Sequence, residues 1–141
     1  MGGLAKSTDL KVRTKLFAIR VIHMVDTLPN KRSADVIAKQ LLRSATSVGA
    51  NYRSACRGRS KAEFLAKLRI VEEEADESSY WMELLIESGM ISEPLVRYLL
   101  AECNEITAMV VSSIRTTRAN QLEMRNSERG VRNSDPTPSP A

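Results

Sequence analysis

Side chains that bind metals or carry redox chemistry are scarce in this sequence, which has one histidine and two cysteines among 141 residues. Because His23 is the single imidazole, a pair of histidine ligands is excluded, as is the Glu-x-x-His motif of di-iron bundles. Cys56 and Cys103 form no CxxC pair, so neither a zinc ribbon nor a disulfide framework is indicated. Both cysteines are predicted to be buried small hydrophobes in a protein of the reducing cytoplasm.

Long apolar runs are also missing. No segment approaches the roughly 20 residues that span a bilayer, and the start MGGLAKSTDLK lacks the hydrophobic stretch of a signal peptide, so no membrane association is expected. Aromatic residues make up 4% of the chain, and glycine and proline are sparse before residue 130, which favours helices over sheets. A chain of this length fits one domain, and the prediction is an all-α protein.

Apolar residues recur in steps of three and four along four stretches, which predicts four helices. The first is expected over residues 9–28. The second starts after Ser33 as its N-cap and ends near Gly58. Ser60 and Glu63 form a capping box that opens the third helix.

Short loops between helices of this length predict an up-down four-helix bundle. Gly89 ends the third helix, and Ser92, Glu93 and Pro94 begin the fourth. The expected organisation is a flexible N-terminus over residues 1–8, the bundle over 9–120, and a disordered C-terminal tail over 121–141. The third helix carries a second apolar edge, which suggests contact between copies of the chain. That edge consists of Ile70, Trp81 and Leu84.

Charge is segregated along the chain. Residues 31–69 hold ten basic and two acidic side chains, whereas residues 72–93 hold eight acidic side chains and no basic one. Either the two regions pair within or between subunits, or the basic one stays free to contact phosphates. The cations expected to contact phosphate are Arg53, Arg57, Arg59 and Lys61 at the turn after the second helix, with Lys39 and Lys31 as secondary candidates.

Carboxylates offer one enzymatic alternative. Glu73, Glu74 and Glu77 on the third helix, with Glu102 and Glu105 on the fourth, could hold Mg²⁺ if the helices face each other. This arrangement is similar to the EExxE and ExxD motifs of all-α nucleoside triphosphate pyrophosphatases, with glutamate at 105 where that family has aspartate.

The stretch QLLRSATSVGANYRSACRGRSKAEFLAKLRIVEEEADES, residues 40–78, resembles the ribosomal-S23-like, or rRNA intervening-sequence protein, family. Two segments depart from the commoner family pattern: NYRSACRG stands where many members read Asn-Ile-Ala-Glu-Gly, and VEEEADES where many have small residues. The matching positions are Gln40, Leu41, Arg43, Ser47, Val48, Asn51, Arg59, Ser60, Glu63, Phe64, Leu68, Ile70 and Glu77.

The resemblance implies a homopentameric four-helix bundle. A related protein, the accessory variability determinant of diversity-generating retroelements, binds nucleic acid and a reverse transcriptase, whereas most members have no known activity. Asn51 and Glu77 lie on or near apolar stripes, so both are expected to be partly buried and to need partners. Glu77 is predicted to pair with Arg43, and Asn51 to bond a neighbouring helix.

The sequence thus predicts a non-enzymatic, cofactor-free homo-oligomer that binds RNA or DNA through its basic turn. A protein partner such as a reverse transcriptase is a further expectation. The alternatives are a protein-interaction scaffold without nucleic-acid binding and the Mg²⁺-dependent pyrophosphatase.

Overall fold

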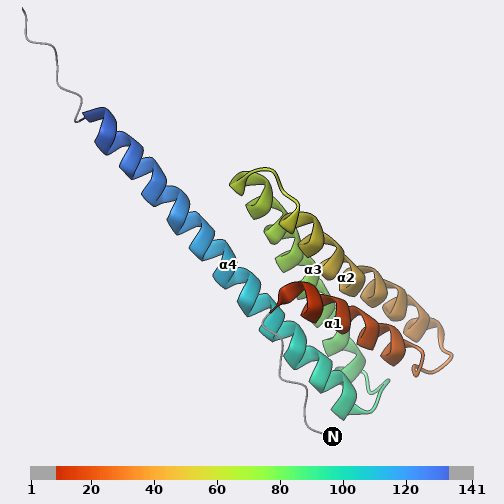
Figure 1. The fold of residues 1–141 in the computed structure, drawn as a ribbon. Coiled ribbons are helices and arrows are strands. Elements are labelled where there is room, and N and C mark those ends of the chain that lie inside the picture. Colours follow the sequence, from red (N-terminus) through yellow and green to blue (C-terminus); the bar gives the residue numbers. More distant parts are fainter. Residues whose placement is uncertain (1–8, 134–141) are drawn as a thin grey trace, which may run out of the picture.

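A computed structural model describes residues 9–133 as four α-helices, without a strand in that range. Each helix contacts its neighbours in the chain, and α1 closes the ring by packing against α4. This is the arrangement of a four-helix bundle, seen in Figure 1. The helices are α1 (Leu10–Val25), α2 (Arg32–Cys56), α3 (Lys61–Glu87) and α4 (Glu93–Asn133).

The predicted start of α3 is confirmed, and that of α2 is wrong. Ser60 is the N-cap of α3, its hydroxyl accepting from the Glu63 N–H at 3.1 Å, while the Glu63 carboxylate accepts from the Arg59 N–H at 2.7 Å. In α2 the N-cap is Lys31, whose side chain makes no capping bond. Ser33 lies inside the first turn, where the Asp35 N–H donates to the Lys31 carbonyl at 3.0 Å, so the helix begins two residues earlier than predicted.

The core forms where the four apolar stripes meet. Fully buried side chains come from every helix, including Phe17, Leu41, Leu68 and Leu99. Helices α1 and α2 approach closely at Gly49, where an added Cβ would lie 3.3 Å from the Thr14 hydroxyl. Gly89 ends α3 with a φ of +70°, a conformation that residues with a Cβ rarely adopt.

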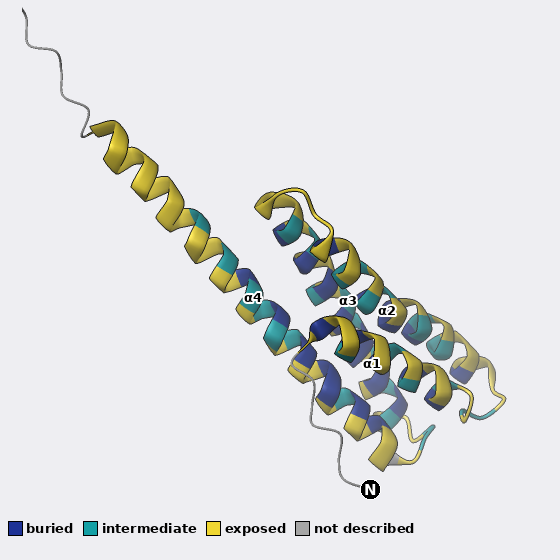
Figure 2. Cartoon of the chain, in the orientation of Figure 1, coloured by how far each residue is buried: buried dark blue, intermediate teal, exposed yellow. Residues whose placement is uncertain are grey.

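Helix α4 continues well beyond the bundle. It has 41 residues, so at about 1.5 Å per residue it extends near 60 Å, whereas α1 has 16 residues. Figure 2 shows its C-terminal part as an almost wholly exposed rod. The prediction of a disordered tail is therefore wrong for residues 121–133, where good helix formers continue the helix without burial. Residues 1–8 and 134–141, the predicted flexible ends, lie outside the described part.

No helix within residues 9–133 combines the length and the hydropathy that a membrane span requires.

Candidate nucleic-acid interface

The turn between α2 and α3 is compact and places several cations together. The Arg57 and Gly58 N–H groups donate to the carbonyls of Ser54 and Ala55 at 3.1 and 3.0 Å. A Cβ at Gly58 would lie only 3.0 Å from the Ala55 carbonyl oxygen, so the turn has no room for a side chain there. It holds four basic residues, here called the turn cluster: Arg53, Arg57, Arg59 and Lys61.

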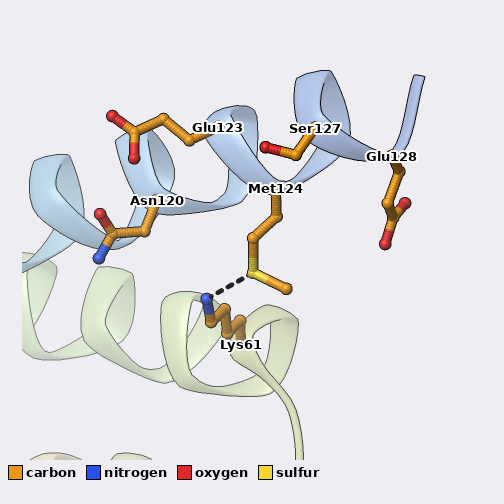
Figure 3. A pocket seen from close by; sticks show the side chains of 6 residues that line it. All are labelled: Lys61, Asn120, Glu123, Met124, Ser127 and Glu128. Carbon is orange, nitrogen blue, oxygen red and sulfur yellow. Dashed lines mark hydrogen bonds between the residues drawn. The ribbon is translucent and has the colours of Figure 1, made fainter. Parts of the chain in front are cut away.

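All four side chains of the turn cluster are exposed, and none forms an ion pair within residues 9–133. The nearest carboxylate in sequence, Glu63, is engaged with the Arg59 backbone N–H. The ammonium of Lys61 lies 3.2 Å from the sulfur of Met124 on α4, a contact drawn in Figure 3. The positive charge of the turn is therefore not neutralised by the fold and can attract an anion.

Lys39 and Lys31 are also exposed, but the structure does not bring them into the turn cluster. Helix α2 separates Lys39 from Arg53 by 14 residues and Lys31 from Arg53 by 22. At about 1.5 Å per residue these separations correspond to 21 and 33 Å along the axis. The two lysines extend the basic surface along α2 toward the opposite end of the bundle.

The predicted ion pair between α2 and α3 is present. A guanidinium nitrogen of Arg43 donates to the carboxylate of Glu77 at 3.0 Å, and the Trp81 indole N–H donates to the same oxygen at 3.3 Å. The side chain of Glu77 is 33% exposed and that of Arg43 61%, so water screens this pair. The other pairing prediction is wrong, because half-buried Asn51 donates to the Ser47 carbonyl of its own helix at 2.9 Å.

A buried polar link that the sequence analysis did not identify joins the same two helices. The Ser78 hydroxyl donates to the Ser44 hydroxyl at 2.9 Å, and both side chains are fully buried. Both serines occupy positions on the apolar stripes of their helices, which is the sequence signal that could have revealed them.

Glu74 is a poorly satisfied carboxylate beside this network, since its Oε2 is buried without a hydrogen-bond partner. Burial raises the pKa of Glu74, and Glu77 raises it further, while Arg43 opposes both. A carboxyl whose pKa is higher in the folded than in the unfolded state binds its proton more tightly in the folded state. Its destabilising effect is therefore absent below the unfolded pKa and complete above the folded one.

We expect Arg43→Gln to lower the free energy of unfolding by up to about 1 kcal/mol near neutral pH. The substitution removes an ion pair and leaves Glu74 and Glu77 to repel each other. Glu77→Gln should have a smaller effect, because it removes that repulsion along with the ion pair. Urea denaturation at neutral pH and near pH 3 measures both, and the loss should disappear in acid. An Arg43→Gln protein as stable as the wild type at neutral pH would contradict this role.

The carboxylates of the pyrophosphatase alternative do not converge. Glu102 accepts from Arg13 on α1 in a bidentate pair, with both distances 2.9 Å, and Glu105 accepts from the same guanidinium. Hydrogen bonding to Glu102 is the main cause that raises the pKa of Arg13. No group of three histidine, cysteine, aspartate or glutamate side chains in residues 9–133 has the geometry of a metal site, so the arrangement that the pyrophosphatase alternative requires is not found there.

The remaining nucleophile and ligand candidates are isolated. His23 is exposed on α1. Cys103 is buried as predicted, its thiol donating to the Ala75 carbonyl at 3.2 Å, and burial raises the pKa of this thiol to about 11. Cys56 is exposed, which contradicts the prediction of burial, because the neighbouring Ala55 occupies the core-facing position at the end of α2.

A second surface appears on α1. Its outer face carries apolar side chains that are 39–44% exposed, opposite the stripe that packs into the core. By contrast, the predicted edge on α3 is only partly open: Ile70 is 37% exposed, and Trp81 and Leu84 are half-buried. The outer face of α1 consists of Val12, Leu16, Ile19 and Ile22.

Together these features define a small all-α protein with a basic turn at one end and an apolar face on α1. The model of the 23S rRNA-intervening sequence protein family matches residues 7–112, and the chain belongs to this family. A solved structure of a protein with unknown function, from the S23 ribosomal protein family of Bacteroides thetaiotaomicron, is 37% identical with a TM-score of 0.71. The match covers 75% of this chain and 98% of that one. No curated protein matches the sequence.

Proposed function

We propose that this protein binds nucleic acid through the turn cluster and the basic surface of α2, acting without catalysis in the cytoplasm. The observation that carries the proposal is the exposure of four cations around one tight turn, none of them paired with a carboxylate in the described chain. Phosphate groups of a nucleic acid supply a regular array of negative charge, and lysine and arginine contacts to them release counterions. Lys39 and Lys31 would lengthen the track along α2.

We also propose that the chain self-associates through the outer face of α1. Four partly exposed apolar side chains on one helix are more than a monomer needs, and their burial between copies would stabilise an assembly. The resemblance that the sequence carries implies five copies. Symmetry would then repeat the turn cluster around the assembly, so that a patch of four cations per chain becomes a larger cationic surface.

The second candidate function is a protein-interaction scaffold, which the α1 face favours. In that case the cations of α2 would pair with the acidic side chains of α3 on another copy. Within residues 9–133 of one chain, the ion pair between these two helices is Arg43 with Glu77. Most of the charge on both helices is therefore available for either function.

The test is fluorescence anisotropy with labelled duplex DNA and structured RNA, at about 50 and 200 mM salt. We expect the wild-type affinity to fall by orders of magnitude across this range. A variant with alanine at all four turn-cluster positions should bind at least tenfold more weakly at the lower salt, with a log–log salt slope reduced by about 3 to 4.

A matched control removes the same number of positive charges elsewhere. It replaces four cations that lie outside α2 and the turn by alanine: Lys11, Lys15, Lys67 and Arg69. This control should keep most of the affinity. Equal losses in the two variants would show that only net charge matters, and a wild type that binds neither probe would leave the scaffold as the function.

A further inference from the structure

The C-terminal part of α4 is a feature of this chain outside the matched family region. The family match ends at residue 112, and the solved relative is covered almost completely by three quarters of this chain. Helix α4 nevertheless continues to Asn133. We call residues 115–133 the α4 extension. In Figures 1 and 2 it projects past the other three helices, with nearly all of its residues exposed.

The α4 extension has five arginines and two glutamates. The arginines and Leu122 follow one another in steps of three and four, a spacing that puts them on one face of a helix. The 17 helical steps from the first arginine to the last span about 26 Å at the ordinary helical rise. We call this face the arginine stripe: Arg115, Arg118, Arg125, Arg129 and Arg132.

The arginine stripe does not lie in the cleft between the α4 extension and the turn. That cleft, about 500 Å³ in volume, is lined by Lys61 and by α4 side chains that include two glutamates. Figure 3 shows these cleft residues around the contact between Lys61 and Met124. Arg125, Arg129 and Arg132 are exposed and are absent from the lining of this cleft. Arg118, at the start of the stripe, lines a second cleft with the acidic residues Glu72, Glu73 and Asp76 of α3. The anion-binding surface is therefore the outer part of the stripe, which consists of Arg125, Arg129 and Arg132.

The composition of the α4 extension distinguishes between possible binding partners: a membrane, a second helix or a nucleic acid. Its large exposed apolar residues are Leu122, Met124 and Val131, and their spacing forms no continuous apolar face. A helix that lies on a membrane or joins a coiled coil needs such a face. Arginine and asparagine on a polar helix instead suit phosphates and base edges, and Asn126 lies next to the stripe.

We propose that the α4 extension lies in the major groove of duplex DNA, with the arginine stripe contacting phosphates and guanine edges. A helix with its side chains is about 10–12 Å wide, which fits the roughly 12 Å major groove of B-form DNA, whereas the major groove of duplex RNA is too narrow. Residues 125–133 of the α4 extension follow the contact between Lys61 and Met124 and are exposed, so a groove can enclose this part of the helix. This inference rests on the proposed nucleic-acid binding and specifies duplex DNA as the ligand.

Two full-length variants test the arginine stripe. The first replaces Arg125, Arg129 and Arg132 by glutamine, a good helix former that keeps α4 intact. The second keeps composition and net charge but moves two arginines off the stripe to cleft positions. It exchanges Arg125 with Asn120 and Arg129 with Ser127, through the substitutions R125N, N120R, R129S and S127R. Circular dichroism checks that helical content is unchanged in both.

Binding is measured by anisotropy with a duplex DNA and a duplex RNA of the same sequence. For DNA we expect the glutamine variant to bind at least tenfold more weakly, with a salt slope lower by about 3, and the exchange variant to lose several-fold. Wild type should protect guanine N7 from dimethyl sulfate, and neither variant should. If either variant binds DNA with wild-type affinity, the arginine stripe is not the contact surface. If wild type binds duplex RNA as tightly as duplex DNA, and the variants lose as much affinity for RNA as for DNA, the assignment to DNA is wrong.

The results for the stripe variants can be distinguished from those for the turn-cluster variant. If only the turn-cluster variant loses affinity, the α4 inference fails and the proposed function stands. If only the stripe variants lose affinity, the turn is not the interface. Binding of anionic lipid vesicles that is lost with the stripe, without DNA binding, would assign the α4 extension to a membrane and overturn the inference.

Discussion

Replacing Arg13 by methionine is expected to lower the free energy of unfolding by about 3–5 kcal/mol. The side chains of Arg13 and Glu102 are only 10% and 9% exposed, and they form a bidentate pair between α1 and α4. Methionine keeps the length of the side chain but leaves the Glu102 carboxylate buried without its cation. A buried charge without its partner is far more costly than the loss of an exposed ion pair.

The pair itself need not be a net source of stability. Replacing both partners, as Arg13→Met with Glu102→Leu, should therefore recover most of the loss, because no unpaired charge remains. Arg13→Lys should fall between, since one ammonium cannot reproduce the bidentate geometry. Urea denaturation of wild type, Arg13→Met, Glu102→Leu and the double variant measures the coupling as a double-mutant cycle. If Arg13→Met alone changes the free energy of unfolding by less than about 1 kcal/mol, the pair behaves as an exposed ion pair and the expectation is wrong.

Replacing Leu16 and Ile19 by glutamate should raise the dissociation constant of the proposed assembly at least 100-fold. Both side chains lie on the outer face of α1 and do not enter the core of the monomer. An uncompensated charge buried between copies would be strongly unfavourable, whereas in a monomer these positions face water. Light scattering with size-exclusion chromatography should give a mass near the 15.7 kDa of one chain for the variant and a larger mass for wild type.

The control places glutamate at two apolar residues that stand alone on the surface, Val36 and Leu122, which are 60% and 59% exposed. This protein should keep the wild-type mass. A wild type that is monomeric at micromolar concentration, or a Leu16→Glu, Ile19→Glu protein that stays assembled, would rule out the outer face of α1 as the contact.

Local patterns in the sequence predicted the number and the type of the helices because helix periodicity, caps and breakers act within a few residues. Ser60 and Glu63 cap α3 as expected, and Gly89 ends it. The end of α4 was predicted wrongly because low hydrophobicity was taken as a sign of disorder. Residues 121–133 are polar but consist mostly of residues with good helix propensity, and a helix that is already formed can continue through them without burial.

Long-range pairing could not be predicted in the same way. Arg43 and Glu77 could be matched because Glu77 lies near the apolar stripe of its helix and both residues belong to the pattern that resembles the family; the structure places them 3.0 Å apart. Arg13 and Glu102 are separated by 89 positions, and no periodicity in either helix marks one for the other. Once Arg13 binds both Glu102 and Glu105, these carboxylates cannot join those of α3 in a metal site.

By itself the sequence determined that this protein is helical, that it has four helices, and that a basic region over residues 31–69 precedes an acidic one over residues 72–93. These properties depend on composition and on spacing within each helix. The tertiary structure decided which charges remain available. It pairs Arg13 with Glu102 and Arg43 with Glu77, and it leaves the turn cluster exposed. It also presents an apolar face on α1 and extends α4 beyond the bundle. Whether a charged side chain is neutralised depends on the helix that packs beside it, and that neighbour is set by the packing of the whole chain.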